Sequence, residues 1–298
     1  MRDGADGSIE AFDLLSNEVR LDILRALGEA EAAGEEMPVS FTELQRRVGV
    51  EDNGRFNYHL SELTGRLVAK LEGGYELKPP GSNIYQAIVS GAYTDDEGTD
   101  PVPVEGEHCP HCGADAAAWY EDSRFHLGCS VCDNLVIRYA IPPASFDRER
   151  PESLLRAGGT YIFRDQLSMR QGICPYCSGT VVRELMEEGG ELEEFNERVY
   201  SSVAKFVCER CGWSMHSGVP FAMNIEPAVI SFFHRHGIAI FERYPWSIYQ
   251  YAEDEVVSRD PLRVEVRCRI DEDVLRLVID DDVTVVESEE LTAELPAE

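Results

Sequence analysis

The N-terminal hydrophobic positions follow the spacing of an amphipathic helix. Over residues 9–28 the apolar side chains recur every three or four residues, and we expect the helical stretch to end at Gly28. Ser16 and Asn17 prefer helix caps to helix interiors, which predicts a break into two helices. The apolar stripe consists of Phe12, Leu15, Val19, Ile23 and Leu27.

Two more helices and a hairpin are predicted before residue 80. Ser40 and Glu43 form a capping box that begins a short helix, and Asp52 or Asn53 can cap the helix that follows. Two alternating stretches around Gly73–Gly74 predict a β-hairpin. This order of elements is that of a winged helix-turn-helix. The buried stripe of the later helix consists of Phe56, Leu60, Leu63 and Leu67.

The rest of the chain mixes helical and extended patterns, so we predict an α+β fold. Helices are expected over 81–93 and over 151–172, with Gly158–Gly159 weakening the middle of the second. A linker is expected over 95–106. Near the C-terminus a helix precedes antiparallel strands. In the first of these strands four residues alternate inward, namely Val264, Val266, Cys268 and Ile270.

Eight of the nine cysteines form Cys-x-x-Cys pairs, which are typical of metal ligands or redox dithiols. Sixteen residues separate the first two pairs, a gap that suits two short strands and the tetrahedral Zn²⁺ site of a zinc ribbon. Thirty residues separate the last two, which predicts a longer hairpin with an acidic tip over 187–197. The pairs are Cys109/Cys112, Cys129/Cys132, Cys174/Cys177 and Cys208/Cys211.

We therefore predict two structural Zn²⁺ ions per chain, because four cysteines leave no open coordination position for catalysis. The alternatives are a redox or metal sensor, and a cross-braced pairing of the four Cys-x-x-Cys pairs. His108, His111 and His216 are expected to be bystanders, and Cys268 a core residue. The expected domains are a winged helix-turn-helix at 1–80, a helix and linker at 81–100, a first zinc-ribbon module at 101–150, a helix and second zinc-ribbon module at 151–223, and a C-terminal α/β segment at 224–298.

The net charge of −29 comes with only three lysines, which favours adaptation to a cytoplasm near saturation in salt. At molar ionic strength the Debye length is about 3 Å, so this charge does not exclude contact with DNA. The N-terminus lacks the layout of a signal peptide, and no apolar run approaches a membrane span. We expect a cytoplasmic protein with no membrane partner.

The helix that begins near Asn53 is the predicted recognition helix, whose exposed N-terminal residues contact base edges in the major groove. Between residues 46 and 70 five basic residues outnumber three acidic ones, which fits phosphate contacts. His59 is equally consistent with packing and with base contact. The predicted base-contacting residues are Arg55, Asn57, Tyr58 and Ser61, and the predicted phosphate-contacting residues are Arg66 and Lys70.

The segments LLSNEVRLDILRAL, FTELQRRV and GRFNYHLSELTGRLV, followed by EGGYEL, resemble the ArsR-like winged helix-turn-helix regulators over about residues 9–80. The whole layout, with paired CPxC modules and the RVEVRCRI tail, is similar to a haloarchaeal group of such regulators. The resemblance implies a dimeric transcriptional repressor. The chain departs from the metal-sensing members because it has no cysteine in this region.

The leading hypothesis is thus a sequence-specific transcriptional regulator that binds double-stranded DNA as a homodimer. The alternative is a basal-transcription or scaffold protein that uses the winged helix and the zinc ribbons for protein contacts. We do not expect an enzyme, because the chain has no glycine-rich phosphate loop, no His-Glu-x-x-His motif and no open metal site. The sequence identifies no effector.

Overall fold

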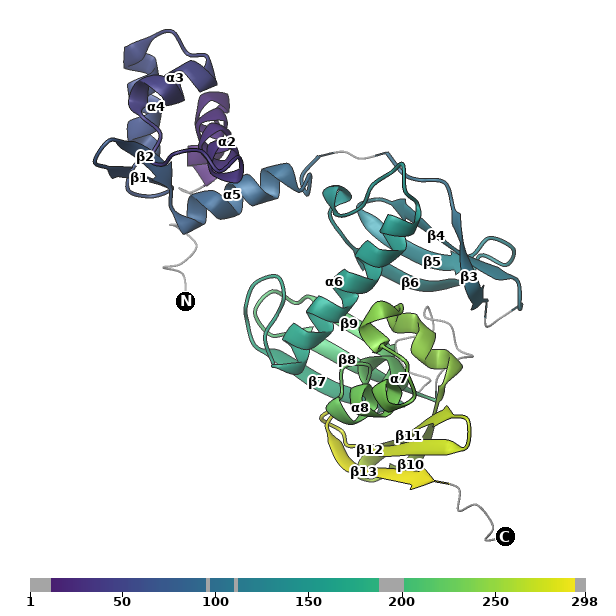
Figure 1. Cartoon of the computed structure of the whole chain (residues 1–298). Helices are drawn as coiled ribbons and strands as arrows, with labels where there is room; N and C mark the ends of the chain where they lie inside the picture. The colour runs from purple at the N-terminus through teal and green to yellow at the C-terminus, as the bar shows by residue number, and fades with distance from the viewer. Residues whose placement is uncertain (1–11, 95–96, 110–111, 188–200, 293–298) are drawn as a thin grey trace, which may run out of the picture. The chain divides into compact units, whose positions relative to one another are not determined.

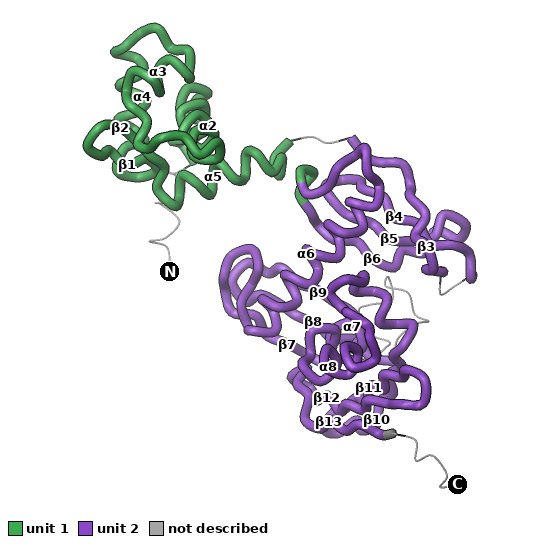
Figure 2. The backbone as a smooth tube through the Cα atoms, viewed as in Figure 1, with its two compact units in different colours: residues 1–95, 142–144 green, residues 96–141, 145–298 purple. Residues whose placement is uncertain are grey.

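The computed structural model describes residues 12–94, 97–109, 112–187 and 201–292. The chain divides into two compact units (Figure 2). Unit 1 comprises residues 1–95 and 142–144, and unit 2 comprises residues 96–141 and 145–298. Helices and antiparallel sheets are both present, which confirms the α+β prediction. None of the described helices is both long and apolar enough to cross a membrane.

Unit 1 contains helices and one hairpin whose ends are set by local capping. Asn17 Oδ1 accepts a hydrogen bond from the Val19 amide at 3.1 Å, so the first helical stretch breaks where predicted. Ser40 and Asp52 cap the next two helices in the same way. The elements are α2 (Glu18–Ala32), α3 (Phe41–Val48), α4 (Asn53–Leu63), β1 (Val68–Leu71), β2 (Gly74–Leu77) and α5 (Pro79–Val89) (Figure 1).

The predicted apolar stripes form the core of unit 1, with one exception. Residues of α2, α3 and α4 are buried together, including Ile23, Leu27, Phe56 and Leu60. Phe12 is 74% exposed, because it precedes the break at Asn17 and does not share a helical face with the α2 stripe. The helix predicted over 81–93 is α5. It begins two residues earlier, since proline suits the first turn of a helix, where no N–H is needed, and it ends at Val89, four residues before the predicted end.

The predicted end of the first helix at Gly28 is wrong, because α2 continues to Ala32. Gly28 is buried against the ring of Tyr85 in α5, and a Cβ atom at Gly28 would lie 2.4 Å from Tyr85 Cγ. The glycine therefore permits the close approach of two helices and does not end one of them.

We expect Gly28→Ala to destabilise unit 1 by about 1–3 kcal/mol, because the added methyl group overpacks the contact with Tyr85. In a Tyr85→Ala background the same change should be neutral or stabilising, since alanine is favoured over glycine inside a helix by up to about 1 kcal/mol. Urea unfolding followed by circular dichroism measures both effects. Equal effects of Gly28→Ala in the two backgrounds would contradict the close approach.

The first sheet of unit 2 is a four-stranded antiparallel sheet with the order β3-β4-β5-β6. Its first strand occupies part of the stretch predicted to be a linker, which corrects that prediction. Val104 is buried, and Pro103 is tolerated because β3 is an edge strand, where a missing N–H costs little. The strands are β3 (Val102–His108), β4 (Asp115–Glu121), β5 (Arg124–Cys129) and β6 (Leu135–Ala140).

Helix α6 (Glu152–Arg170) is continuous through the glycine pair that was expected to weaken it. A Cβ atom at Gly158 would lie 2.8 Å from the ring of Phe125, and one at Gly159 would lie 3.1 Å from Pro245 Cδ. Both glycines therefore let other segments of unit 2 pack directly onto the helix backbone.

The remainder of unit 2 contains a three-stranded and a second four-stranded antiparallel sheet with short helices between them. The inward alternation of Val264, Val266, Cys268 and Ile270 is confirmed, since all four are buried. Apart from Glu187, the predicted acidic tip lies outside the described residues. The elements are β7 (Val181–Glu187), β8 (Ser202–Cys208), β9 (Ser214–Gly218), α7 (Val219–Ala222), α8 (Pro227–Arg235), β10 (Ala252–Arg259), β11 (Leu262–Ile270), β12 (Asp273–Ile279) and β13 (Val285–Thr292).

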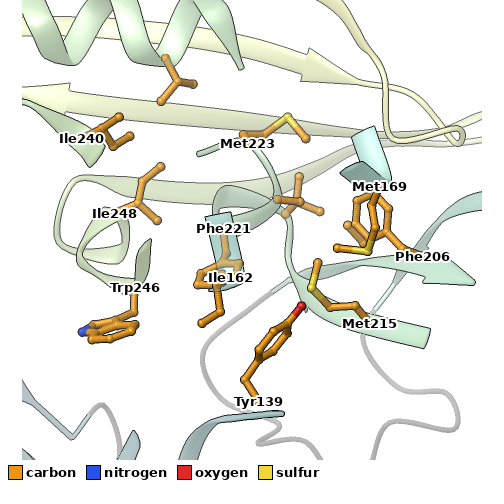
Figure 3. Packing of buried hydrophobic residues seen from close by; sticks show 14 of the residues in the cluster. Tyr139, Ile162, Met169, Phe206, Met215, Phe221, Met223, Ile240, Trp246 and Ile248 are labelled. Carbon is orange, nitrogen blue, oxygen red and sulfur yellow. The ribbon is translucent and has the colours of Figure 1, made fainter. Parts of the chain in front are cut away.

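One hydrophobic core joins these parts of unit 2. Figure 3 shows Tyr139 of β6, Met169 of α6, Phe206 of β8 and Trp246 in the same cluster. The core therefore includes both stretches that carry the cysteine pairs.

His236, which follows α8, links this helix to the C-terminal sheet. Its Nδ1 lies 2.8 Å from the Phe232 carbonyl oxygen, and its Nε2 lies 3.0 Å from the Asp273 carboxylate. Only a protonated imidazole can donate from both nitrogens. These acceptors, the carbonyl first, raise the pKa of His236 above its ordinary value of 6.5.

Because the pKa of His236 is raised in the folded state, its two hydrogen bonds stabilise the fold fully below pH 6.5. This stabilisation is lost as the pH rises through the raised pKa. We therefore expect Asp273→Asn to lower the melting temperature more at about pH 6 than at about pH 9. Thermal unfolding of the parent and the variant at both pH values measures this difference. The same loss at both values would show that His236 is not the titrating partner.

Candidate functional sites

The first candidate metal centre lies in the turns between β3 and β4 and between β5 and β6. It is formed by Cys109, Cys112, Cys129 and Cys132, whose sulfur atoms all lie within 4.8 Å of one another. The Cys109–Cys132 and Cys112–Cys129 Sγ–Sγ distances are 3.6 and 3.5 Å. Four thiolates at about 2.3 Å from a tetrahedral ion stand about 3.8 Å apart, whereas disulfide sulfurs stand about 2.05 Å apart. The spacing fits a metal ion.

The second centre has the same construction on the β7–β8–β9 sheet. It is formed by Cys174, Cys177, Cys208 and Cys211. The Cys174–Cys211 and Cys177–Cys208 Sγ–Sγ distances are 3.8 and 3.4 Å. The eight predicted ligands thus gather in the two predicted sets, and the cross-braced alternative is not adopted. Both groups could hold a metal ion.

Each Cys-x-x-Cys pair is followed by a residue in the left-handed backbone conformation. These residues are Gly113, Asp133, Ser178 and Gly212, with φ values of 74°, 54°, 55° and 74°. At Gly113, Ser178 and Gly212 the amide donates to the carbonyl of the first cysteine of the pair, at 2.9 to 3.0 Å. The two sites therefore share the same local turn. The sequence carried a signal for it, since a small or turn-forming residue recurs at this offset.

Backbone amides favour the thiolate at equivalent cysteines of the two sites. Hydrogen bonds from the backbone of Cys132 and Val131 lower the pKa of Cys129 to about 7. Hydrogen bonds from the backbone of Cys211 and Arg210 lower the pKa of Cys208 to about 6. Burial raises the pKa of Cys132 in the first site to about 12. In the second site a backbone hydrogen bond from Gly179 opposes burial and the neighbouring thiols, which together raise the pKa of Cys177 to about 12. The thiols of one site thus differ in how readily they release the proton that metal binding displaces.

Beside the second site lies a buried acid that the sequence reasoning missed. Asp165 of α6 is completely buried, and its carboxylate accepts hydrogen bonds from the Tyr139 hydroxyl at 2.8 Å and from Arg164 Nε at 2.7 Å. Burial, reinforced by the Asp165 charge, raises the pKa of Tyr176, inside the Cys174–Cys177 pair, to about 12. Asp165 thus connects β6, α6 and the second site. No local pattern could have revealed it, because its buried partner Tyr139 is 26 residues away in sequence.

Cys268, His108 and His216 lie outside both cysteine groups. Cys268 is fully buried, and burial raises the pKa of its thiol to about 12, which confirms the prediction of a core residue. His108 Nδ1 lies 3.2 Å from the Asp115 carboxylate, and burial lowers the pKa of His216. His111 lies outside the described residues.

The residues predicted to contact DNA are all exposed, and four of them lie on α4. Ser61 Oγ donates to the Tyr58 carbonyl at 2.7 Å, and the Arg20 guanidinium lies 6.0 Å from the centre of the Tyr58 ring. His59 is buried, which resolves its ambiguity in favour of packing. Lys70 Nζ lies 5.9 Å from the Tyr75 ring centre. The exposed set is Arg55, Asn57, Tyr58, Ser61, Arg66 and Lys70.

The basic residues of α3 are already paired within unit 1. Arg46 Nε lies 2.8 Å from a Glu43 carboxylate oxygen, and Arg47 Nε lies 2.7 Å from the same carboxylate while its Nη2 pairs with Glu35. Hydrogen bonds from Arg46 and then Arg47 lower the pKa of Glu43 to about 2. Arg46 and Arg47 are two of the five basic residues counted between residues 46 and 70. Because carboxylates of Glu43 and Glu35 compensate their charge, the other three basic residues supply the remaining positive charge of this segment.

Comparisons with known proteins place the chain in a family. Residues 106–285, more than half of the chain, match the family model described as domain of unknown function DUF7351. Residues 8–88 match the model described as domain of unknown function DUF7347. No curated protein and no solved structure matches the chain. The chain belongs to the DUF7351 family.

Proposed function

We propose that unit 1 is a winged helix-turn-helix domain of the ArsR-like class, and that the protein is a cytoplasmic transcriptional repressor that binds specific sites on double-stranded DNA. The division of α4 into a buried and an exposed face carries this proposal. Phe56 and Leu60 are buried, whereas Arg55 and Asn57 in its first turns are exposed. Helix α4 follows the short helix α3 and precedes the β1–β2 hairpin, which is the order of a recognition helix and its wing.

The exposed residues of α4 have the chemistry of direct base readout. An arginine can donate two hydrogen bonds to the O6 and N7 atoms of guanine, and an asparagine can pair with the N6 and N7 atoms of adenine. In this role Arg55 and Asn57 read bases. Lys70 on the β1 strand, with Arg66 before it, contacts phosphates and sets the orientation on the duplex.

We propose Zn²⁺ as the ion of both cysteine sites. Four thiolates in a tetrahedral set are the donors that zinc takes in structural sites. When bound, the ion joins two turns of each module and contributes folding energy. Because all four positions are filled by sulfur, the sites have no place for a substrate, and their role is to hold unit 2 together.

We expect a homodimer, since a two-fold operator needs two recognition helices about 34 Å apart. The first helical segment and α5 are the proposed contact, and exposed apolar side chains at Phe12, Val89 and Tyr93 support it. Light scattering at micromolar protein in multimolar salt should give a dimer mass, and Val89→Ser with Tyr93→Ser should shift the mass towards the monomer. Leu167→Ser, at an exposed apolar residue of unit 2, is the matched control. A strictly monomeric parent would contradict the proposal.

Genome-wide crosslinking of the tagged protein in the organism that makes it tests the function directly. The expected result is a limited set of promoter peaks that share a palindromic sequence, and a purified promoter fragment should bind the protein. A signal that follows RNA polymerase over all active genes, with no shared sequence, would overturn the proposal.

A second candidate is a basal-transcription or scaffold protein, which one observation favours. A groove of about 430 Å³ beside the first metal centre is lined by Trp119, His126, Pro101 and Leu135. The rings of Trp119 and His126 are stacked, with centres 5.1 Å apart. A partly apolar groove with aromatic walls suits contact with another protein. Co-purification with RNA polymerase that Trp119→Ala abolishes would favour this candidate.

A further inference from the structure

Unit 2 contains a small hollow that is lined by two arginines and a glutamine. It lies among α6, β7, β8, α7 and the turn before β13, and the centre of a water-sized group can move through about 20 Å³ of it. Gln166 and Arg170 of α6 and Arg183 of β7 line it, together with the apolar side chains of Phe206 and Met223. About 10–15 Å³ of such space holds one water, so this space takes one or two oxygen-sized groups of a small ligand.

Two guanidinium groups line this hollow, and only one of them is neutralised. Arg170 forms a bidentate pair with Glu226. Arg183 is half-buried, and its guanidinium has no hydrogen-bond or ion-pair partner within the part of the chain that the structure describes. Its guanidinium is therefore available to pair with an anion that enters the recess. Two guanidinium groups and one carboxylate leave a net positive charge for an anion.

Gln166 adds an acceptor to this positive site. It is 3% exposed, and its Nε2 donates to the Phe221 carbonyl at 2.9 Å. This bond fixes the orientation of the amide, because the reverse orientation would set two oxygen atoms against each other. Its Oε1 has no partner among the described residues. A buried acceptor without a partner is costly, so the hollow favours a group that donates a hydrogen bond to this oxygen.

We propose that this hollow binds a small oxyanion that carries a hydroxyl group, and that hydrogen phosphate represents the ligand class. The anionic oxygens pair with Arg183 and Arg170, and the hydroxyl group donates to Gln166 Oε1. Arginine suits this task because its planar donors match the geometry of an oxyanion. The inference does not depend on DNA binding, because every residue of the hollow belongs to unit 2.

Calorimetric titration of inorganic phosphate into the full-length, metal-containing protein at constant ionic strength tests this site. We expect one saturable site per chain and at least tenfold weaker binding by Arg183→Gln. Arg269→Gln is the matched control, because it removes one positive charge from an exposed arginine of β11 that pairs with Glu253. The control should bind phosphate as the parent does. Circular dichroism verifies that both variants are folded.

A parallel titration with sulfate tests the role of Gln166, because sulfate has a similar size and no hydroxyl group at neutral pH. Sulfate should bind at least tenfold more weakly than phosphate. No saturable phosphate binding, or undiminished binding by Arg183→Gln, would overturn the site. Equal affinities for phosphate and sulfate would overturn the proposed hydroxyl contact.

Discussion

Removal of zinc from both cysteine groups is expected to unfold unit 2 and to leave unit 1 folded. A structural zinc site contributes about 10–16 kcal/mol of binding free energy at neutral pH, which matches the whole stability of a typical domain, about 5–15 kcal/mol. Cys174 and Cys208 belong to the hydrophobic core of unit 2, so loss of the ion also disturbs that core. Residues 1–95 contain no cysteine.

Metal analysis should find one zinc ion for each cysteine group, two per chain. Limited proteolysis and circular dichroism before and after chelation should show the loss of unit 2 alone. Cys129→Ser is expected to remove one ion, whereas Cys268→Ala, which alters a cysteine outside both groups, should retain both. Fewer than one zinc ion per chain, or a unit 2 that still resists protease after chelation, would contradict the proposal.

Arg55→Ala and Asn57→Ala are each expected to weaken binding to the native operator by about 1–3 kcal/mol and to relax specificity at one base position per half-site. Both side chains are exposed in the first turns of α4, away from the buried stripe. Lys70→Ala should instead weaken binding to all sequences alike, because phosphates carry no sequence information. Fluorescence anisotropy with operator and scrambled duplexes measures both effects.

Arg46→Ala provides the matched control for these variants. Arg46 is an exposed arginine of α3 whose guanidinium pairs with Glu43, so its removal should change operator affinity little. Circular dichroism establishes that each variant is folded. If Arg55→Ala and Asn57→Ala bind the operator as tightly as the parent does, then α4 is not the base-reading element.

Features that depend on neighbouring residues could be predicted from the sequence. The caps at Asn17, Ser40 and Asp52 lie where predicted because a cap bonds to an amide two or three residues away. The cysteine groups were also predictable, since a Cys-x-x-Cys turn brings two sulfurs together locally and a hairpin brings two such turns together.

Features set by distant partners were misread or missed. In the sequence, Gly28 resembles a residue that ends a helix, and Gly158 resembles one that weakens a helix. The structure shows instead that each glycine leaves room for an aromatic ring, that of Tyr85 or of Phe125. The β3 strand was hidden by Pro103, which disfavours a strand unless the strand lies at a sheet edge. Asp165 gave no signal at all, because a buried carboxylate is defined by the donors that surround it.

The internal pairing of the α3 arginines has a thermodynamic consequence for the proposed DNA complex. Each phosphate neutralised by a protein cation releases condensed counterions, and the logarithm of the binding constant falls with the logarithm of salt concentration by about 0.9 per phosphate. Arg46 and Arg47 are already neutralised by Glu43 and Glu35, so they displace few ions from the duplex. The slope for the proposed complex should therefore reflect the phosphate contacts of Arg66 and Lys70 and be smaller than a count of all five basic residues between 46 and 70 would give.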